Sequence, residues 1–123
     1  PTVPRLVWIM FHLADSLEGA MLLKHCLAAK LLVRVTMSGL HNPDWPTAPA
    51  ILPAVAALGR MAVQSKAIRE DVLDCQAVTG CVRLLQEGVE RKLGDICITT
   101  LSSLAEGSLG QALIRKEGGL EYF

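Results

Sequence analysis

Residues 93–123 read LGDICITTLSSLAEGSLGQALIRKEGGLEYF, and the order of elements in this stretch decides the fold that we expect. A long amphipathic segment closes on Leu101-Ser102-Ser103-Leu104-Ala105 and is followed by a turn at Glu106-Gly107. A second helical segment ends in Lys116-Glu117-Gly118-Gly119, and an apolar stretch starts again at Leu120. Two helices joined by a tight turn, with a further apolar segment directly afterwards, predict a series of packed helices.

The order of these elements resembles the armadillo repeat, in which a segment closing on a Leu-Ser-Asn-Leu-Ala-like phrase precedes a short helix, a small-residue turn and another helix. HEAT repeats share this apolar pattern, but the short helix with its glycine turn favours armadillo. The resemblance implies a right-handed α-α superhelix, or helical solenoid, built from units of three helices. It also implies that the closing helices line a concave groove that holds extended peptides or other proteins.

The closing phrase Leu101 to Ala105 should recur at a spacing of about 40 residues if the resemblance holds. Leu58-Gly59-Arg60-Met61-Ala62 matches this phrase at an offset of 43 residues. Met10-Phe11-His12-Leu13-Ala14 matches the second phrase at an offset of 48 residues. The sequence therefore holds three copies of the closing phrase.

The segments between the closing phrases also recur. Residues 32–35 match residues 81–84 at an offset of 49, and residues 79–81 match residues 118–120 at an offset of 39. The unequal offsets indicate loops of different length. We therefore expect a single segment of about three partial repeats, a slice of a longer solenoid, with units at roughly residues 1–16, 17–64, 65–107 and 108–123.

The composition favours helices over strands. Hydrophobic residues make up 51% of the 123 residues but aromatic residues only 4%, so Leu, Ala, Val, Ile and Met must form the core. Such a core suits close-packed helices better than a sheet, because sheets favour aromatic and β-branched residues. The sequence therefore predicts an all-α fold.

The charge balance restricts the partners. Twelve basic and twelve acidic residues cancel, which argues against nucleic-acid binding and against a polybasic membrane patch.

The charge-free run of residues 45–59 is shorter than the roughly 20 residues of a membrane-spanning helix, and residues 1–4 do not resemble a secretory signal. We expect an intracellular, cytoplasmic protein, with the nucleus and the cytoskeleton as alternatives, that binds a protein or peptide partner within a larger complex.

Four cysteines, Cys26, Cys75, Cys81 and Cys97, could in principle form two disulfides. They lie within apolar helical patterns rather than in the loop-rich setting of a small secreted protein. We therefore expect four free, buried thiols, as in a reducing compartment.

The spacing of apolar residues predicts the individual elements. Ser38 to Pro46 is the strongest loop signal, because it combines a glycine with two prolines. Thr47 is expected to cap the next helix with Pro49 in its first turn, so Pro53 should either delay that helix or bend it. Ala77 to Gly80 is expected to form a tight connection. Helices are expected at residues 5–14, 51–63, 67–75, 81–85 and 90–104, with a last one ending near residue 116. The dense apolar segment 17–35 fits one or two helices, and the armadillo resemblance implies a division into a short helix at residues 19–26 and a longer one at about 27–37.

Histidine and cysteine side chains do not form a catalytic or metal-binding pattern. His12, His25 and His41 lack the spacing of metal ligands, so no metal site is expected. His25 and Cys26 are adjacent, but neighbouring helical residues point about 100° apart, which favours a core thiol beside a surface histidine over a nucleophile with its base.

Carboxylates and glycines give no stronger signal. Asp71 and Asp74 could form a carboxylate pair, but the nearby Lys66 and Arg69 favour a solvated charged face. The glycines of residues 107–110 and 118–119 complete no phosphate-binding motif and are expected to end helices. We expect no cofactor and no enzymatic activity.

The resemblance assigns two positions of each closing helix to the concave groove. Peptide-binding armadillo proteins often carry an Asn in the closing phrase, whose amide grips the peptide backbone, and a Trp one turn earlier, whose ring forms a side-chain pocket. Here the Asn position reads His12, Arg60 and Ser103, and the Trp position reads Trp8, Ala56 and Thr99. Because only Trp8 matches, a receptor for basic nuclear-import signals is not expected.

Binding through shape and a few anchors is compatible with this departure from the family pattern. The expected protein-binding residues on the concave face are Trp8, His12, Arg60 and Ser103. Trp and Arg are residue types that often dominate binding energy at interfaces. The alternative for Trp8 is a structural role, in which its ring packs under a preceding unit.

Two functions from different classes follow from these observations. The first is a non-enzymatic protein–protein interaction scaffold, which contributes a binding surface to a larger assembly. The second is a helical regulatory domain of a larger enzyme whose catalytic residues lie outside this chain. Further copies of the closing phrase in adjoining sequence would support the scaffold, and a nucleotide or metal motif there would support the regulatory domain.

Overall fold

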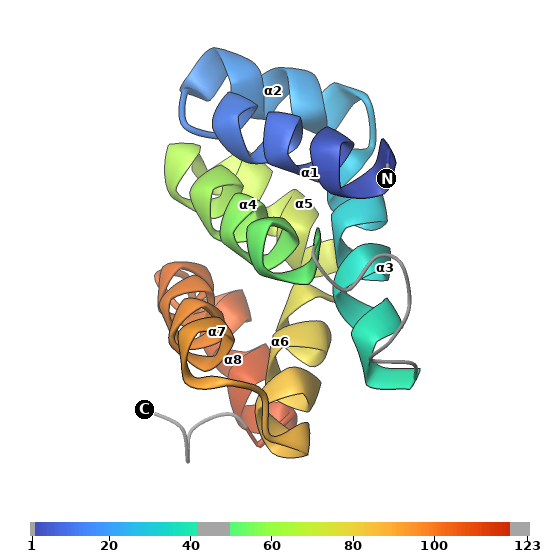
Figure 1. Ribbon diagram of the computed structural model, residues 1–123. Helices are drawn as coiled ribbons and strands as arrows, with labels where there is room; N and C mark the ends of the chain where they lie inside the picture. The colour runs from blue at the N-terminus through green and yellow to red at the C-terminus, as the bar shows by residue number, and fades with distance from the viewer. Residues whose placement is uncertain (1, 42–49, 119–123) are drawn as a thin grey trace.

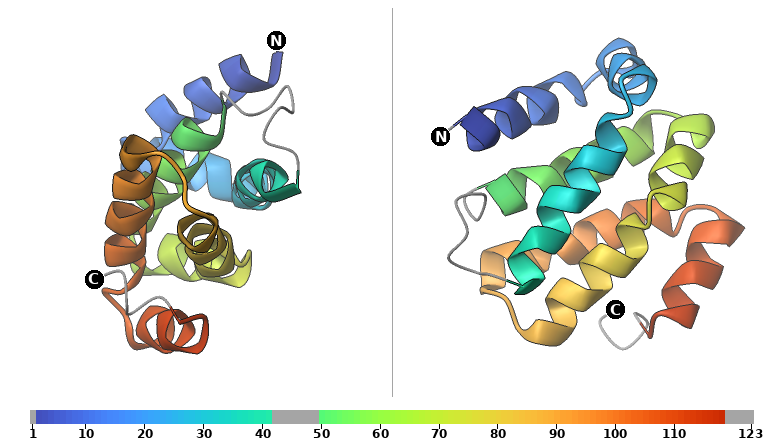
Figure 2. Two further views of the ribbon diagram at one scale, coloured as in Figure 1. Left: turned by 60° about the horizontal axis from the view of Figure 1, so that its bottom comes forward. Right: turned by 90° about the vertical axis from the view of Figure 1, so that its right-hand side faces the viewer.

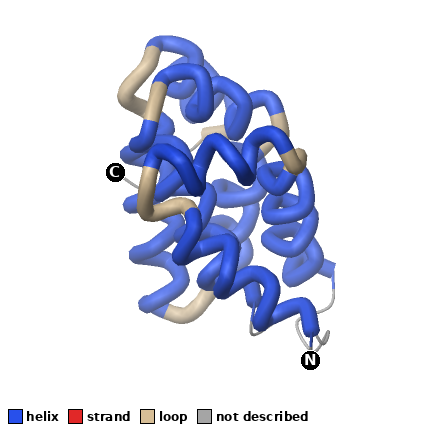
Figure 3. The backbone as a smooth tube through the Cα atoms, turned by 90° about the horizontal axis from the view of Figure 1, so that it is seen from above, coloured by secondary structure: helices blue, strands red, loops and turns tan. Residues whose placement is uncertain are grey.

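Eight α-helices and no strand make up the part of the chain that the computed structural model describes, residues 2–41 and 50–118 (Figures 1 and 3). The prediction of an all-α fold is confirmed. The helices are α1 (Thr2–Leu13), α2 (Leu17–His25), α3 (Ala28–His41), α4 (Ile51–Gln64), α5 (Lys66–Asp74), α6 (Ala77–Glu87), α7 (Arg91–Leu104) and α8 (Ser108–Lys116).

The helices pack in rows of equivalent elements. Helices α1, α4 and α7 lie side by side and run in the same direction, and α3 lies beside α6 (Figures 1 and 2). Helix α4 is at the centre, because it contacts α1, α3, α5 and α7. The closing phrases supply much of the core, since Leu58, Met61, Leu101 and Leu104 are fully buried.

Serine caps begin two of the short helices. The Ser16 hydroxyl accepts a hydrogen bond from the Gly19 N–H, and the Ser65 hydroxyl accepts one from the Ile68 N–H, at 3.1 Å in each case. Each bond satisfies a donor of the first helical turn, which has no partner within its own helix. Ser65 is also the only residue between α4 and α5, so α4 passes directly into the next helix.

The connections α2–α3 and α5–α6 have the same geometry. Each consists of a cysteine that ends the first helix, Cys26 or Cys75, and a residue in the left-handed region, Leu27 with φ 58° or Gln76 with φ 68°. The two turns are 49 residues apart, which is the offset expected from the sequence. Gly118, with φ 80° after α8, repeats the position of Gln76.

The expected connection at Ala77 to Gly80 is wrong. Helix α6 begins at Ala77, and Gly80 lies inside it, where a Cβ would meet Met37 and Thr36 of α3 at 3.5 Å. Gly80 is therefore a buried helical residue at the contact between α3 and α6 rather than part of a turn. The offset of 39 residues between Gly80 and the C-terminal glycines is therefore replaced by 42, from Gln76 to Gly118.

The predicted loop is shorter than expected at its start. Helix α3 continues to His41, so Ser38 to His41 are helical rather than part of the loop. The expected delay of the next helix is confirmed, because α4 begins at Ile51 and Pro53 lies in its first turn, where its missing N–H removes no helical hydrogen bond. The expected roles of Thr47 and Pro49 lie outside the described residues.

Candidate functional site: a groove across α1, α4 and α7

An open groove of about 350 Å³ lies over helices α1, α4 and α7. Helix α1 contributes one wall residue, α4 forms the floor, and α7 forms the opposite wall. The groove is lined by Phe11, Leu52, Ala56, Gly59, Arg60, Val63, Ile96, Thr99, Thr100 and Ser103. Most of the lining is apolar, with one guanidinium and three hydroxyl groups.

The groove brings together two of the four residues expected on the concave face. Arg60 and Ser103 both line it, although 43 residues separate them in the sequence. Ala56 and Thr99, which occupy the position one turn earlier, line it as well. The two expected positions of α4 and α7 therefore face the same space.

Trp8 and His12 lie beside the groove rather than in it. Both contact the Phe11 ring, Trp8 at 5.4 Å between ring centroids with an interplanar angle of 88°, and His12 at 5.3 Å. Such edge-to-face contacts are the favoured geometry of aromatic pairs. The Trp8 side chain remains 43% exposed. The structure thus joins Trp8, His12 and Arg60 through Phe11.

Arg60 is held by α1. Its guanidinium carbon lies 3.7 Å from the centroid of the Phe11 ring, a cation–π contact, and its Nη1 donates a long hydrogen bond of 3.5 Å to the Phe11 carbonyl. The same Nη1 lies 3.6 Å from the Asp15 carboxylate, an ion pair worth at most about 1 kcal/mol because Asp15 is largely exposed. A guanidinium has five N–H donors, so Arg60 keeps capacity for an acceptor from a partner.

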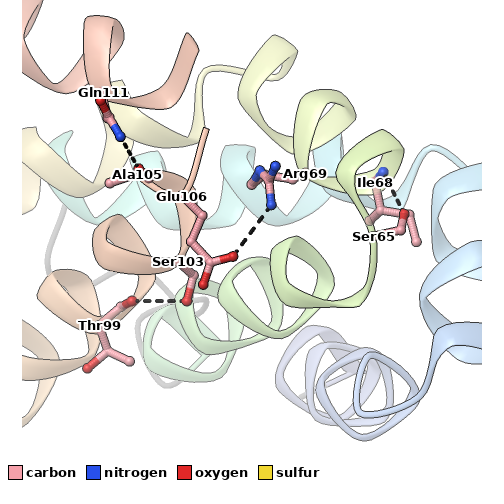
Figure 4. A network of polar contacts seen from close by, with 8 residues as sticks. All are labelled: Ser65, Ile68, Arg69, Thr99, Ser103, Ala105, Glu106 and Gln111. Atoms are coloured by element: carbon pink, nitrogen blue, oxygen red, sulfur yellow. Dashed lines mark hydrogen bonds and ion pairs between the residues drawn. The ribbon is translucent and has the colours of Figure 1, made fainter. Parts of the chain in front are cut away.

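The hydroxyl groups of the α7 wall are oriented by their own helix. Ser103 donates to the Thr99 carbonyl at 3.2 Å, as Figure 4 shows, and Thr99 donates to the Asp95 carbonyl at 2.9 Å. A hydroxyl that donates in this way still offers two acceptor lone pairs. The α7 wall can therefore accept hydrogen bonds from a ligand, and the α4 floor can donate them through Arg60.

Small residues allow α4 and α7 to approach closely. A Cβ on Gly59 would lie 2.8 Å from Thr100 Oγ1, closer than such contacts are found. Thr100 is buried and donates to the Val55 carbonyl of α4 at 3.0 Å. Gly59 and Thr100 thus fix the distance between the floor and one wall of the groove.

Sequence reasoning missed Phe11 and Gly59 as groove residues. Phe11 precedes the expected His12 in the closing phrase, and Gly59 precedes Arg60 in the same way. The residue before the Asn position was therefore the available signal. On α1 this residue is Phe11, whose ring contacts Arg60. On α4 it is Gly59, which leaves room for Thr100.

Clusters that would suggest metal binding do not form among the residues that the structure describes, where no three His, Cys, Asp or Glu side chains converge. No described helix has the length and hydrophobicity needed to cross a bilayer. A larger surface depression of about 650 Å³ lies between α3 and the α5–α6 turn, lined in part by Lys30, Arg34, Asp74 and Cys75.

The expectation of buried thiols holds only in part. All four cysteines are free, and Cys81 and Cys97 are buried, where their thiols share a hydrogen bond between α6 and α7. The hydrogen bond to Cys97, followed by burial, raises the pKa of the Cys81 thiol well above its ordinary value. Cys26 is instead exposed, and Cys75 is half-buried, because both end helices. The expected core thiol beside His25 is therefore wrong.

The four thiols should react with a maleimide in a fixed order. Cys26 should react first, and Cys75 more slowly, because burial and the neighbouring Asp71 and Asp74 raise the pKa of its thiol and so lower its thiolate fraction. Cys81 and Cys97 should react only on unfolding. Mass spectrometry of labelled peptides measures the order. Fewer than four reactive thiols under non-reducing denaturation would contradict the expectation of free cysteines.

Comparison with known proteins leaves the residues themselves as the basis for assigning a function. No protein-family model, no curated protein and no solved structure matches this chain.

Proposed function

We propose that this chain is a protein-binding scaffold of the armadillo type, in which α1, α4 and α7 are the closing helices of successive units in a helical solenoid. The observation that supports this most strongly is the groove, because the equivalent positions of α4 and α7 line one open space. The repeated left-handed turns after Cys26 and Cys75 and the serine caps at Ser16 and Ser65 agree with a repeated unit.

The groove suits an extended segment of a partner protein. Its apolar lining can take up an aliphatic or aromatic side chain between Phe11, Val63 and Ile96. Arg60 can donate to a backbone carbonyl or a carboxylate of the same segment, while the Ser103 hydroxyl can accept from a backbone N–H. Buried aromatic and arginine anchors of this kind contribute most of the binding energy at protein interfaces.

Peptide selection tests the proposal. Peptides selected from a random library on the immobilised chain should shift the backbone amide NMR signals of Arg60 and Ser103 and of their neighbours on α4 and α7. Arg60→Ala should weaken the binding of such a peptide by about tenfold, as expected for loss of an arginine anchor. Binding is measured by fluorescence anisotropy of the labelled peptide.

Arg83→Ala is the matched control, because Arg83 is an exposed arginine on α6 and does not line the groove. Its effect on the dissociation constant should stay within about twofold, the scale of an uninvolved surface position. Failure to select any peptide, shifts confined to α2 and α5, or equal effects of the two substitutions would each reject the groove as the binding site.

A further inference from the structure

Apolar side chains are exposed along the side of α1 and α3 that faces away from the rest of the molecule. On α1 these are Leu6, 42% exposed, and Ile9, 56% exposed. On α3 the exposed residue is Leu31, at 37%. Single exposed apolar residues are common on protein surfaces, so the equivalent positions elsewhere in the chain decide whether these three are normally covered.

The equivalent positions of the other closing helices are buried. Leu6 corresponds to Ala54 of α4 and to Cys97 of α7, and both of these residues are fully buried. Cys97 is covered by the preceding helix of its own unit, since its thiol is hydrogen-bonded to Cys81 of α6. Ile9 corresponds to Ala57 and Thr100, and Thr100 is covered by α4, the closing helix of the preceding unit.

The equivalent position on α6 is buried as well. Leu31 corresponds to Gly80 at the offset of 49 residues, and Gly80 packs against Thr36 and Met37 of α3. Leu31 thus occupies the surface of α3 to which a helix of a preceding unit would be packed.

A single helix can cover both Leu6 and Leu31, and α3 shows how. Helix α3 contacts α4, the closing helix of its own unit, and α6, the equivalent helix of the next unit (Figure 2). A helix placed in the same way one unit earlier would contact α1 and α3. It would cover Leu6 as α6 covers Cys97, and Leu31 as α3 covers Gly80.

We propose that a helix preceding α1 in the same polypeptide seats across α1 and α3 and covers Leu6 and Leu31, in the position that α3 takes relative to α4 and α6. A closing helix before it would cover Ile9. The surface is therefore an interface between successive units, and neither Leu6 nor Leu31 has an equivalent among the groove residues. This inference rests on the proposed solenoid arrangement but not on what the groove binds.

Cysteine accessibility tests this interface. In a Cys26→Ser background, Leu6→Cys and Leu31→Cys are compared in the 123-residue chain alone and in the polypeptide as its own cell makes it. Ala67→Cys is the control, because Ala67 and its equivalents Glu18 and Leu109 are all exposed. Both test positions should react with a maleimide rapidly in the chain alone and at least about tenfold more slowly in the cellular polypeptide, as expected for a packed helix that must open first.

The remaining outcomes distinguish other occupants. Equal rates in the two polypeptides would overturn the proposal, as would protection that survives proteolytic removal of the segment before α1. Concentration-dependent protection in the chain alone, together with a dimer mass in analytical ultracentrifugation, would assign the surface to a second copy instead. Amide hydrogen exchange of α1 in the unsubstituted polypeptides gives an independent readout, with slower exchange expected only when the preceding segment is present.

Discussion

Replacing Gly110 with alanine is expected to destabilise the chain by about 3–5 kcal/mol, at the upper end of what a single added methyl group costs in a packed site. A Cβ on Gly110 would lie 1.8 Å from the Leu104 carbonyl oxygen, an atom of the main chain that cannot move aside as a flexible side chain would. Gly19 is in the same position, 1.8 Å from the Leu13 carbonyl oxygen, and Gly19→Ala should have a similar effect. The midpoint and slope of urea unfolding measure both.

Gly94→Ala is the matched control for these substitutions. Gly94 is also helical, but its Cβ would meet only the ends of the Leu85 and Val89 side chains, at 3.8 and 3.9 Å. Alanine there should stabilise the chain by about 0.5–1 kcal/mol, since it is the better helix former. If Gly110→Ala were as stable as Gly94→Ala, the close approach of α8 to the end of α7 would be wrong.

The two glycines reveal a repeat that sequence reasoning overlooked. Leu13-Ala14-Asp15-Ser16-Leu17-Glu18-Gly19 and Leu104-Ala105-Glu106-Gly107-Ser108-Leu109-Gly110 match at an offset of 91 residues, with Leu, Ala, an acid and Gly in register. Both segments connect a closing helix to a short helix through three residues. At α4–α5 the connection is Ser65 alone, and Ile68 replaces the glycine. A glycine at this position therefore occurs where the connection has three residues and not where it has one.

Side chains from neighbouring elements further stabilise these helix ends. The Gln64 amide of α4 donates to the Ala14 carbonyl at 3.1 Å. The Gln111 amide of α8 donates to the Ala105 carbonyl at 2.9 Å, as Figure 4 shows. Each bond satisfies a carbonyl at a helix C-terminus that has no helical partner. Arg69 of α5 lies 3.6 Å from Glu106 in the connection that follows α7. These contacts link α4 to the end of α1, α8 to the end of α7, and α5 to the α7–α8 connection.

Periodicity predicted most of the helices but neither all of their ends nor their close contacts. Leu58, Met61, Leu101 and Leu104 recur with the closing phrase, and their burial follows from apolar spacing alone. Gly80 was misassigned to a turn, because a glycine in the sequence does not show whether it ends a helix or lies buried inside one. Its contact with α3 is a property of the packed structure.

The candidate site could be predicted by position and not by chemistry. Arg60 and Ser103 were expected on one face because equivalent residues of parallel helices align. The stacking of Arg60 on Phe11 could not be expected, since it depends on the separation of α1 and α4. Cys26 was misplaced in the core because its apolar neighbours indicated burial, although a helix was expected to end there and the residue at that end is exposed.

Gly59→Ala is expected to destabilise the chain by about 1–2 kcal/mol, the cost of overpacking less the gain in helix propensity. The added Cβ would lie 2.8 Å from Thr100 Oγ1 and 3.4 Å from Thr100 Cα. Relief requires α7 to move away from α4 or the Thr100 hydroxyl to give up its bond to the Val55 carbonyl. Either change should widen the groove and weaken the binding of a selected peptide.

A double-mutant cycle assigns this cost to the contact between α4 and α7. Thr100→Ala removes Oγ1, the nearest atom, at the loss of a buried hydrogen bond worth about 0.5–1.5 kcal/mol. In that background Gly59→Ala should cost about half as much as in the unsubstituted chain, because only the contacts at 3.4 Å remain. Strictly additive effects on the free energy of unfolding would show that Gly59 and Thr100 do not touch. The spacing that keeps the groove open would then have to be set elsewhere on α4 and α7.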